Sequence, residues 1–120
     1  MEEVSGRKKD LEYIKNQPML VAKDNPKNLG KVKFGKPHSF TFCLENNGNQ
    51  TITVDKLVVG CNSCTKASLK KTIIRPSESV LLDVVFTPGS LGDQKKFITV
   101  KWGGLVNDLK LAFTAQSYEH

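Results

Sequence analysis

The chain has 120 residues, of which 38% are hydrophobic and 25% are charged. This length fits a single domain with its own core, and this composition excludes a disordered or fibrous chain. The net charge of +6 favours polyanionic partners without identifying one, and no apolar run approaches the roughly 20 residues of a membrane-spanning helix.

The first segment of the chain, residues 1–17, is polar and is closed by Pro18. Leu11 and Ile14 supply one helical turn, which is too little apolar surface for a stable amphipathic helix. We therefore predict an extended N-terminal arm over residues 1–17 and a folded domain over residues 18–120. The arm has no apolar signal region, and three cysteines are an odd number, so we expect a reducing, cytoplasmic compartment.

Short strands are predicted through the first half of the domain. An edge strand over residues 19–23 is followed by a crossing segment over residues 28–32. Residues 38–45 alternate between apolar and polar side chains, as in a half-buried strand. Asn47-Gly48 then predicts a tight hairpin into a strand over residues 51–59, with an irregularity near Asp55 and Lys56.

The second half continues the pattern with strands over residues 67–74, 79–87, 95–102 and 109–113. Proline and glycine pairs separate the last three of these strands. About seven strands without helical periodicity predict an all-β fold, an immunoglobulin-like antiparallel β-sandwich. The predicted core residues are Phe40, Phe42, Leu44, Ile52, Val54, Val80, Leu82, Val84, Phe86, Ile98, Val100, Trp102, Leu109, Leu111 and Phe113.

Several segments carry a resemblance to a known family. They are Leu29-Gly30-Lys31-Val32, Glu45-Asn46-Asn47-Gly48-Asn49-Gln50, Gly60-Cys61-Asn62-Ser63-Cys64-Thr65 and Val84-Val85-Phe86-Thr87-Pro88. Over about residues 28–115 the chain resembles the DUF1573 family, which belongs with Ig-like domains related to major sperm protein and to the ASPM, SPD-2 and Hydin proteins. The resemblance implies an Ig-like sandwich without established chemistry, and most members are exported bacterial proteins. Two residues separate the cysteines here, where the family usually has one.

Cys61 and Cys64 form the only motif in the sequence that could carry out chemistry. A structural zinc site needs four ligands, and the remaining candidates are Cys43, His38 and His120. A redox Cys-x-x-Cys pair normally begins a helix, and no helix is predicted here. We expect ordinary loop thiols that are dispensable for the fold, with a disulfide or a metal site as the alternatives.

Catalytic patterns are missing from the sequence. The two histidines lie at a strand start and at the chain end, and there is no phosphate-binding glycine loop and no H-E-x-x-H motif. We therefore expect no enzyme, no cofactor, no metal and no small-molecule substrate. The phenylalanines fall on predicted core faces, so we expect no specific nucleic-acid partner, and the lack of an apolar span predicts no membrane partner.

An Ig-like domain with a polar arm favours a structural or interaction module that binds a protein partner in a larger assembly. Our leading hypothesis is an accessory protein, decoration or auxiliary, of a bacteriophage capsid, assembled into the virion in the host cytoplasm. The alternatives are a bacterial cell-envelope or periplasmic adaptor of the DUF1573 type, and a thiol redox or metal-binding protein that uses Cys61 and Cys64. The expected contact residues are Arg7, Lys8, Lys9, Leu11, Tyr13, Ile14 and Lys15 in the arm, and Lys66, Lys70, Lys71 and Arg75 in a second basic segment.

Overall fold

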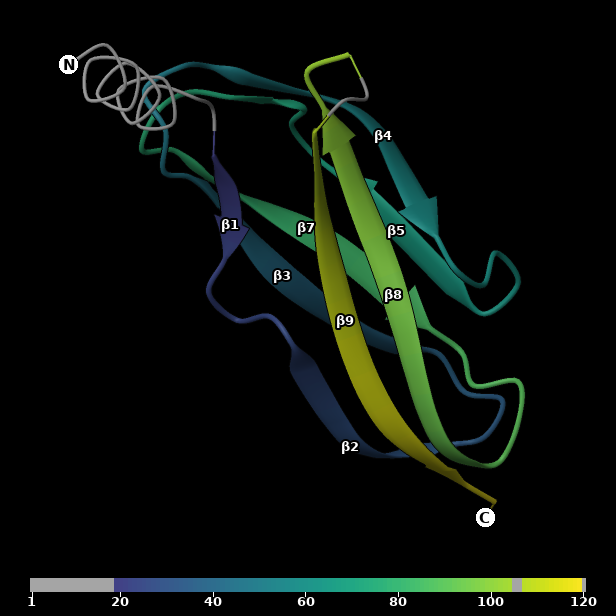
Figure 1. Ribbon diagram of the computed structural model, residues 1–120. Helices are drawn as coiled ribbons and strands as arrows, with labels where there is room; N and C mark the ends of the chain where they lie inside the picture. Colours follow the sequence, from purple (N-terminus) through teal and green to yellow (C-terminus); the bar gives the residue numbers. More distant parts are fainter. Residues whose placement is uncertain (1–18, 105–106, 120) are drawn as a thin grey trace, which may run out of the picture.

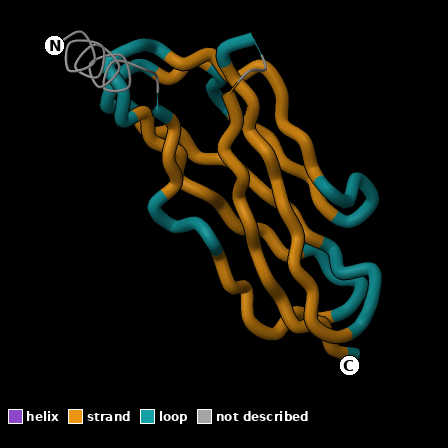
Figure 2. The backbone as a smooth tube through the Cα atoms, in the orientation of Figure 1, coloured by secondary structure: helices purple, strands orange, loops and turns teal. Residues whose placement is uncertain are grey.

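Two β-sheets packed face to face make up the computed structural model, which describes residues 19–104 and 107–119 (Figure 1). The four-stranded sheet runs in the order β1 (Leu20–Ala22), β3 (His38–Asn46), β7 (Ser79–Phe86) and β5 (Thr65–Leu69). The five-stranded sheet runs in the order β2 (Lys27–Lys33), β9 (Asn107–Tyr118), β8 (Gly92–Trp102), β4 (Ile52–Val59) and β6 (Ile73–Ile74). The predicted Ig-like sandwich is confirmed. Most loops gather at its two ends (Figure 2), and the described residues form no helix that could span a bilayer.

The core follows from the two-residue period of the strands, because alternate side chains of a strand point to the same face. Every predicted core residue is buried except Phe40 and Leu109, which are half-buried and pack against the core. The Phe40 ring meets the Phe113 ring edge-to-face, with 4.9 Å between the centroids. The core also includes five residues that were not predicted to belong to it: Leu20, Val32, Cys64, Ile74 and Ala115.

The hairpin predicted at Asn47-Gly48 is wrong, because β3 and β4 lie in different sheets. The preceding residue, Asn46, is fully buried. Its side-chain amide donates to the carbonyl oxygens of Gln50 at 2.8 Å and Ile74 at 2.9 Å. Its Oδ1 accepts from the backbone N–H of Gly48 at 2.9 Å. These hydrogen bonds stabilise a connection that crosses to the other sheet, in place of a hairpin that returns alongside β3.

Two further expectations need correction. The strand expected over residues 67–74 is divided between the sheets, since β5 pairs with β7 and β6 pairs with β4. The sandwich is not wholly antiparallel, because β2 pairs with β9 in parallel, with a register shift between Asn28 and Lys31. The irregularity expected near Asp55 and Lys56 is confirmed as a register shift between Val54 and Lys56.

The passage from β1 to β2 takes the chain from one sheet to the other, and two side chains replace backbone pairing there. The Asp24 carboxylate accepts from the backbone N–H of Cys43 in β3, at 3.1 and 3.2 Å to its two oxygens. The Asn25 side chain donates to the carbonyl oxygen of Lys110 at 3.1 Å and accepts from the N–H of Ala112 at 2.8 Å, both in β9. At this crossing, backbone groups of β3 and β9 thus have side-chain hydrogen-bond partners in place of a neighbouring strand.

Replacing Phe42 tests the assignment of the inner face. Phe42 is fully buried, so Phe42→Ala should lower the free energy of unfolding by about 3–5 kcal/mol in urea titrations. Leu81 is the matched control, because it lies opposite Cys43 on the outer face and is 50% exposed. Leu81→Ala should change the free energy of unfolding by about 0.5 kcal/mol or less. Equal losses in the two variants would contradict the inner-face assignment.

Candidate functional site

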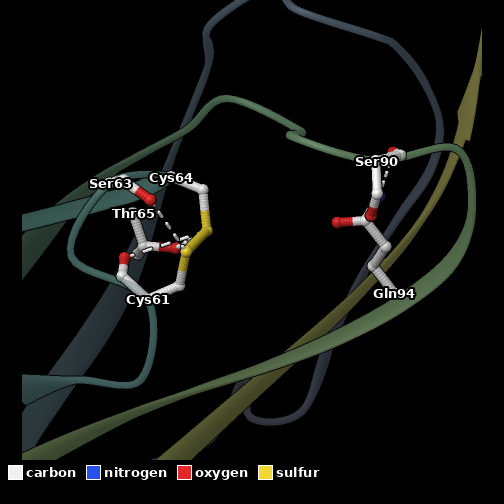
Figure 3. The surroundings of a disulfide bond; sticks show 6 residues. All are labelled: Cys61, Ser63, Cys64, Thr65, Ser90 and Gln94. Atoms are coloured by element: carbon white, nitrogen blue, oxygen red, sulfur yellow. Dashed lines mark hydrogen bonds between the residues drawn. A yellow bond between two sulfur atoms is a disulfide. The ribbon is translucent and has the colours of Figure 1, made fainter.

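A disulfide joins Cys61 and Cys64 in the turn between β4 and β5 (Figure 3). The N–H of Thr65 donates to the carbonyl oxygen of Cys61 at 2.9 Å, which closes the turn. The two Cα atoms are consequently 5.5 Å apart, a separation that a disulfide can bridge. The structure thus differs from the expectation of ordinary loop thiols and contains the disulfide that the sequence left as an alternative.

The disulfide lies within the turn by which the chain passes from β4 of the five-stranded sheet to β5 of the four-stranded sheet. Cys64 is buried and belongs to the core, whereas Cys61 is half-buried, with its Sγ 3.6 Å from the Oγ of Ser63. Cys43 is a free, half-buried thiol on β3. Within residues 19–104 and 107–119, no group of three or more His, Cys, Asp or Glu side chains could hold a metal ion.

The second basic segment lies along the edge where the chain crosses from β5 to β6. Lys66 lies opposite Val85 on β7, and Lys70 and Lys71 lie in the turn between the strands. Arg75 follows β6. The four cations are exposed and are spread from the four-stranded sheet at Lys66 to the end of β6 at Arg75. The predicted contacts of the arm lie outside the described residues: Arg7, Lys8, Lys9, Leu11, Tyr13, Ile14 and Lys15.

Glu78 holds part of this segment in place. Its Oε1 accepts from the backbone N–H of Arg75 at 2.7 Å, and its Oε2 lies 3.0 Å from the Nζ of Lys71. The backbone hydrogen bond from Arg75, followed by the hydrogen bond from Lys71, lowers the pKa of Glu78. Lys71 is therefore engaged within the chain, which leaves Lys66, Lys70 and Arg75 as the cations of this edge available to a partner.

The outer face of the five-stranded sheet carries a feature that the sequence reasoning missed. Phe97 on β8 is 41% exposed. The Nζ atoms of Lys95 and Lys110 lie 5.5 Å and 5.6 Å from the centroid of its ring. The alternation of residues 95–102 predicts the buried side chains of β8, and Lys95 and Phe97 lie on the other face of the strand. This exposed face contains a sequence signal for the cluster, but Lys110 comes next to Phe97 only through the pairing of β8 with β9.

A hollow of about 460 Å³ lies on the five-stranded sheet between β2, β9 and β8. The register shift in β2 adjoins it, since both Asn28 and Gly30 line it. Its other lining residues are Asp93, Gln94, Lys95, Thr114, Ala115 and Gln116. Small-molecule sites are usually lined mainly by hydrophobic and aromatic side chains, whereas polar and small residues line this hollow and no aromatic residue is among them.

The disulfide leads to a stability prediction. In the chain-entropy description, a cross-link over so short a loop stabilises the fold by about 2 kcal/mol. The Cys61→Ser/Cys64→Ser variant should therefore stay folded, with a free energy of unfolding lower by about that amount in urea titrations. Cys43→Ser is the control for loss of a thiol outside the disulfide. A double variant that fails to fold would contradict the expectation that the pair is dispensable.

The Glu78 contacts predict a pH dependence. Because its pKa is lower in the folded chain, the stability that Glu78 contributes is complete above its unfolded-state pKa and is lost as the pH falls through its folded-state pKa. The stability difference between the parent and Glu78→Gln should consequently shrink on acidification, as measured by urea titrations at several pH values. The exposed Glu119 supplies a control variant, Glu119→Gln. A difference that is constant with pH would show that the carboxylate contacts contribute nothing.

Comparisons with known proteins agree with this geometry. The family described as a protein of unknown function, DUF1573, matches residues 20–117. A protein of unknown function from Porphyromonas gingivalis W83 superposes with a TM-score of 0.71 at 15% identity, over 85% of this chain and 48% of that one. No curated protein matches.

Two further structures share the fold. The VesB protease of Vibrio cholerae superposes with a TM-score of 0.66 at 15% identity, over 88% of this chain and 34% of the protease. The PapD-like domain 7 of human CEP192 gives 0.63 at 14% identity, over 88% of both chains. This chain thus spans half or less of the bacterial proteins, and at these identities the likeness concerns the fold alone. The match to the family covers most of the sandwich, and the chain belongs to the DUF1573 family.

Proposed function

We propose that the chain is a non-enzymatic adaptor module of the bacterial cell envelope that binds another protein. The disulfide between Cys61 and Cys64 is the observation that carries this proposal. Disulfides persist in oxidising compartments such as the periplasm and are rare in the cytosol. The disulfide therefore favours the exported setting that the family resemblance implied over the cytoplasmic compartment that the first residues suggested.

The environment of the titratable side chains supports a non-enzymatic role. The Nε2 of His38 lies 3.3 Å from the carbonyl oxygen of Lys33, so this histidine has a backbone partner. Cys61 and Cys64 are joined to each other, which removes two of the three thiols as nucleophiles. The likeness to VesB covers about a third of that protease and transfers no activity.

The outermost strands support protein binding. β5 ends the four-stranded sheet on one side, and β6 ends the five-stranded sheet. The outer edge of such a strand offers backbone groups that a strand of a partner can pair with. Lys66 and Ser68 are exposed on β5, and the disulfide fixes the start of this strand. An acidic extended segment is the partner that this basic edge favours.

The capsid hypothesis has less support than the envelope proposal. It depended on the arm, residues 1–17, which lies outside the described residues. It also depended on a cytoplasmic setting, against which the disulfide argues. A virion role stays a prediction from the sequence, and it supplies the alternative outcome of the experiment that follows.

Site-specific photo-crosslinking in cells that produce the full chain tests the adaptor role. A photoreactive residue at Ser68, on the outermost strand β5, should give a discrete protein adduct in the fraction released by osmotic shock. The same residue at Ser39 is the matched control, because Ser39 is exposed but lies on β3, which β7 separates from the β5 edge. Ser39 should give no such adduct, because a partner strand added to β5 lies beyond β7 from it.

The cysteines report the compartment in the same cells. After acid quenching, a maleimide should label Cys43 at once and should label Cys61 and Cys64 only after reduction. Recovery in the cytoplasmic fraction with all three thiols labelled at once would contradict the envelope proposal. Stoichiometric recovery in purified virions would replace it with the capsid role.

A further inference from the structure

The pairing of four strands gathers lysines on the outer face of the five-stranded sheet. Residues opposite each other in a sheet share a face. Lys101 lies opposite Lys56 of β4 and Asp108 of β9, and Thr99 lies opposite Lys110. The register of β2 adds two more lysines opposite Gln116 and Tyr118. We call this surface the lysine face: Lys31, Lys33, Lys56, Lys95, Lys101 and Lys110.

The lysine face points away from the core. The alternate residues of β8 and β9, among them Ile98, Val100 and Leu111, are buried between the sheets. The side chains of the lysine face therefore project from the opposite side of the same strands. Five of the six lysines are exposed, and Lys101 is half-buried.

The charge on this face is strongly positive. Asp93 and Asp108 are the acidic residues that the pairing of β8 with β9 places on it. Asp108 lies 3.8 Å from the Nζ of Lys101 and so offsets that lysine. The other five lysines have no carboxylate of a described residue within ion-pair distance. A field of one sign over one face attracts an anionic partner.

Exposed apolar side chains lie among these lysines. Phe97 is 41% exposed between Lys95 and Lys110, and Val58 on the neighbouring strand is 37% exposed. Val58 lies opposite Thr99, two residues along β8 from Phe97. The face thus combines an aromatic side chain and an aliphatic side chain with surrounding cations.

The type of cation decides which anionic partner fits. All six cations of the face are lysines, and protein interfaces are depleted in lysine and enriched in arginine. Lysines act as point charges that an anionic lipid surface attracts without a fixed geometry, and an exposed Phe beside such cations can bury its ring at the boundary of headgroups and acyl chains. We propose that the lysine face binds the surface of anionic phospholipid bilayers, with Phe97 inserted at the headgroup level.

This contact is peripheral, so it does not need a membrane-spanning segment. The sequence-based expectation of no membrane partner depended on the lack of such a segment. Side chains that lie on a bilayer bind it through buried apolar area and attraction to anionic lipids. The proposal is independent of the adaptor role, because the lysine face and the β5 edge belong to different sheets.

Vesicle sedimentation with the full chain tests the proposal. The probes are vesicles of phosphatidylcholine alone and vesicles that also contain about 30% phosphatidylglycerol, an anionic lipid. At about 0.1 M salt the chain should sediment with the anionic vesicles only, and at about 1 M salt it should be released, because the Debye length falls from about 10 Å to about 3 Å.

Matched variants locate the contact. Each lysine near an anionic surface contributes about a factor of five to binding, so Lys95→Ala/Lys110→Ala should weaken the partition coefficient about thirtyfold. Lys66→Ala/Lys70→Ala removes the same charge at the β5 edge of the four-stranded sheet. This variant should change the partition coefficient by about twofold or less. When anionic vesicles are added, the fluorescence emission of Phe97→Trp should shift to shorter wavelength. The emission of the parent should not shift. Thermal melting of each variant confirms that the domain is folded.

Three results would overturn the proposal. The first is the lack of sedimentation with anionic vesicles at low salt. The second is an equal loss of binding in the two lysine variants, which would assign the attraction to net charge. The third is binding of soluble polyglutamate through Lys95 and Lys110 without vesicle binding, which would identify an acidic protein as the partner of this face.

Discussion

Asn46 joins the two sheets at the point where β3 ends. Its side-chain amide donates to the carbonyl oxygens of Gln50, which precedes β4, and of Ile74, which belongs to β6; both strands are in the five-stranded sheet. Its backbone N–H donates to the carbonyl oxygen of Glu78 at 3.0 Å, and its carbonyl oxygen accepts from the N–H of Ser77 at 2.9 Å. Each buried polar group without a partner costs about 1–3 kcal/mol. An apolar side chain at this position would remove the hydrogen bonds to the carbonyl oxygens of Gln50 and Ile74 and would therefore lower the free energy of unfolding. Asn46 therefore ties the end of β3 to the segment before β4, to β6 and to the turn before β7.

Two further crossings between the sheets have equally specific contacts. Asp24 and Asn25 hold the passage from β1 to β2, and the Cys61–Cys64 disulfide holds the passage from β4 to β5. The core supplies the bulk of the burial, but burial is non-directional and does not determine which strands are neighbours. The polar and covalent contacts at these crossings are directional, and they help to set which strands become neighbours.

Local patterns in the sequence predicted local features and failed where a distant residue decides the structure. The alternation of β3, β7 and β8 predicted most of the core, because the period of a strand is a local property. Asn47-Gly48 failed as a hairpin signal because the Asn46 amide binds Ile74, which lies 28 residues further along the chain. The disulfide was not preferred because it depends on the geometry of the turn and not on the count of cysteines. The lysine face could not be predicted, since it needs the register of four strands at once.

The two sheets thus differ in what they offer a partner. The four-stranded sheet ends in the basic edge strand β5, and the five-stranded sheet presents lysines around Phe97. Nuclear magnetic resonance of the full chain with lipid nanodiscs that contain phosphatidylglycerol tests this division directly. A paramagnetic lipid should broaden the amide signals around Phe97 on β8 and around Lys110 on β9, and should leave β3 and β7 unchanged. Broadening centred on β3 and β7, or broadening nowhere in the sandwich, would contradict the account.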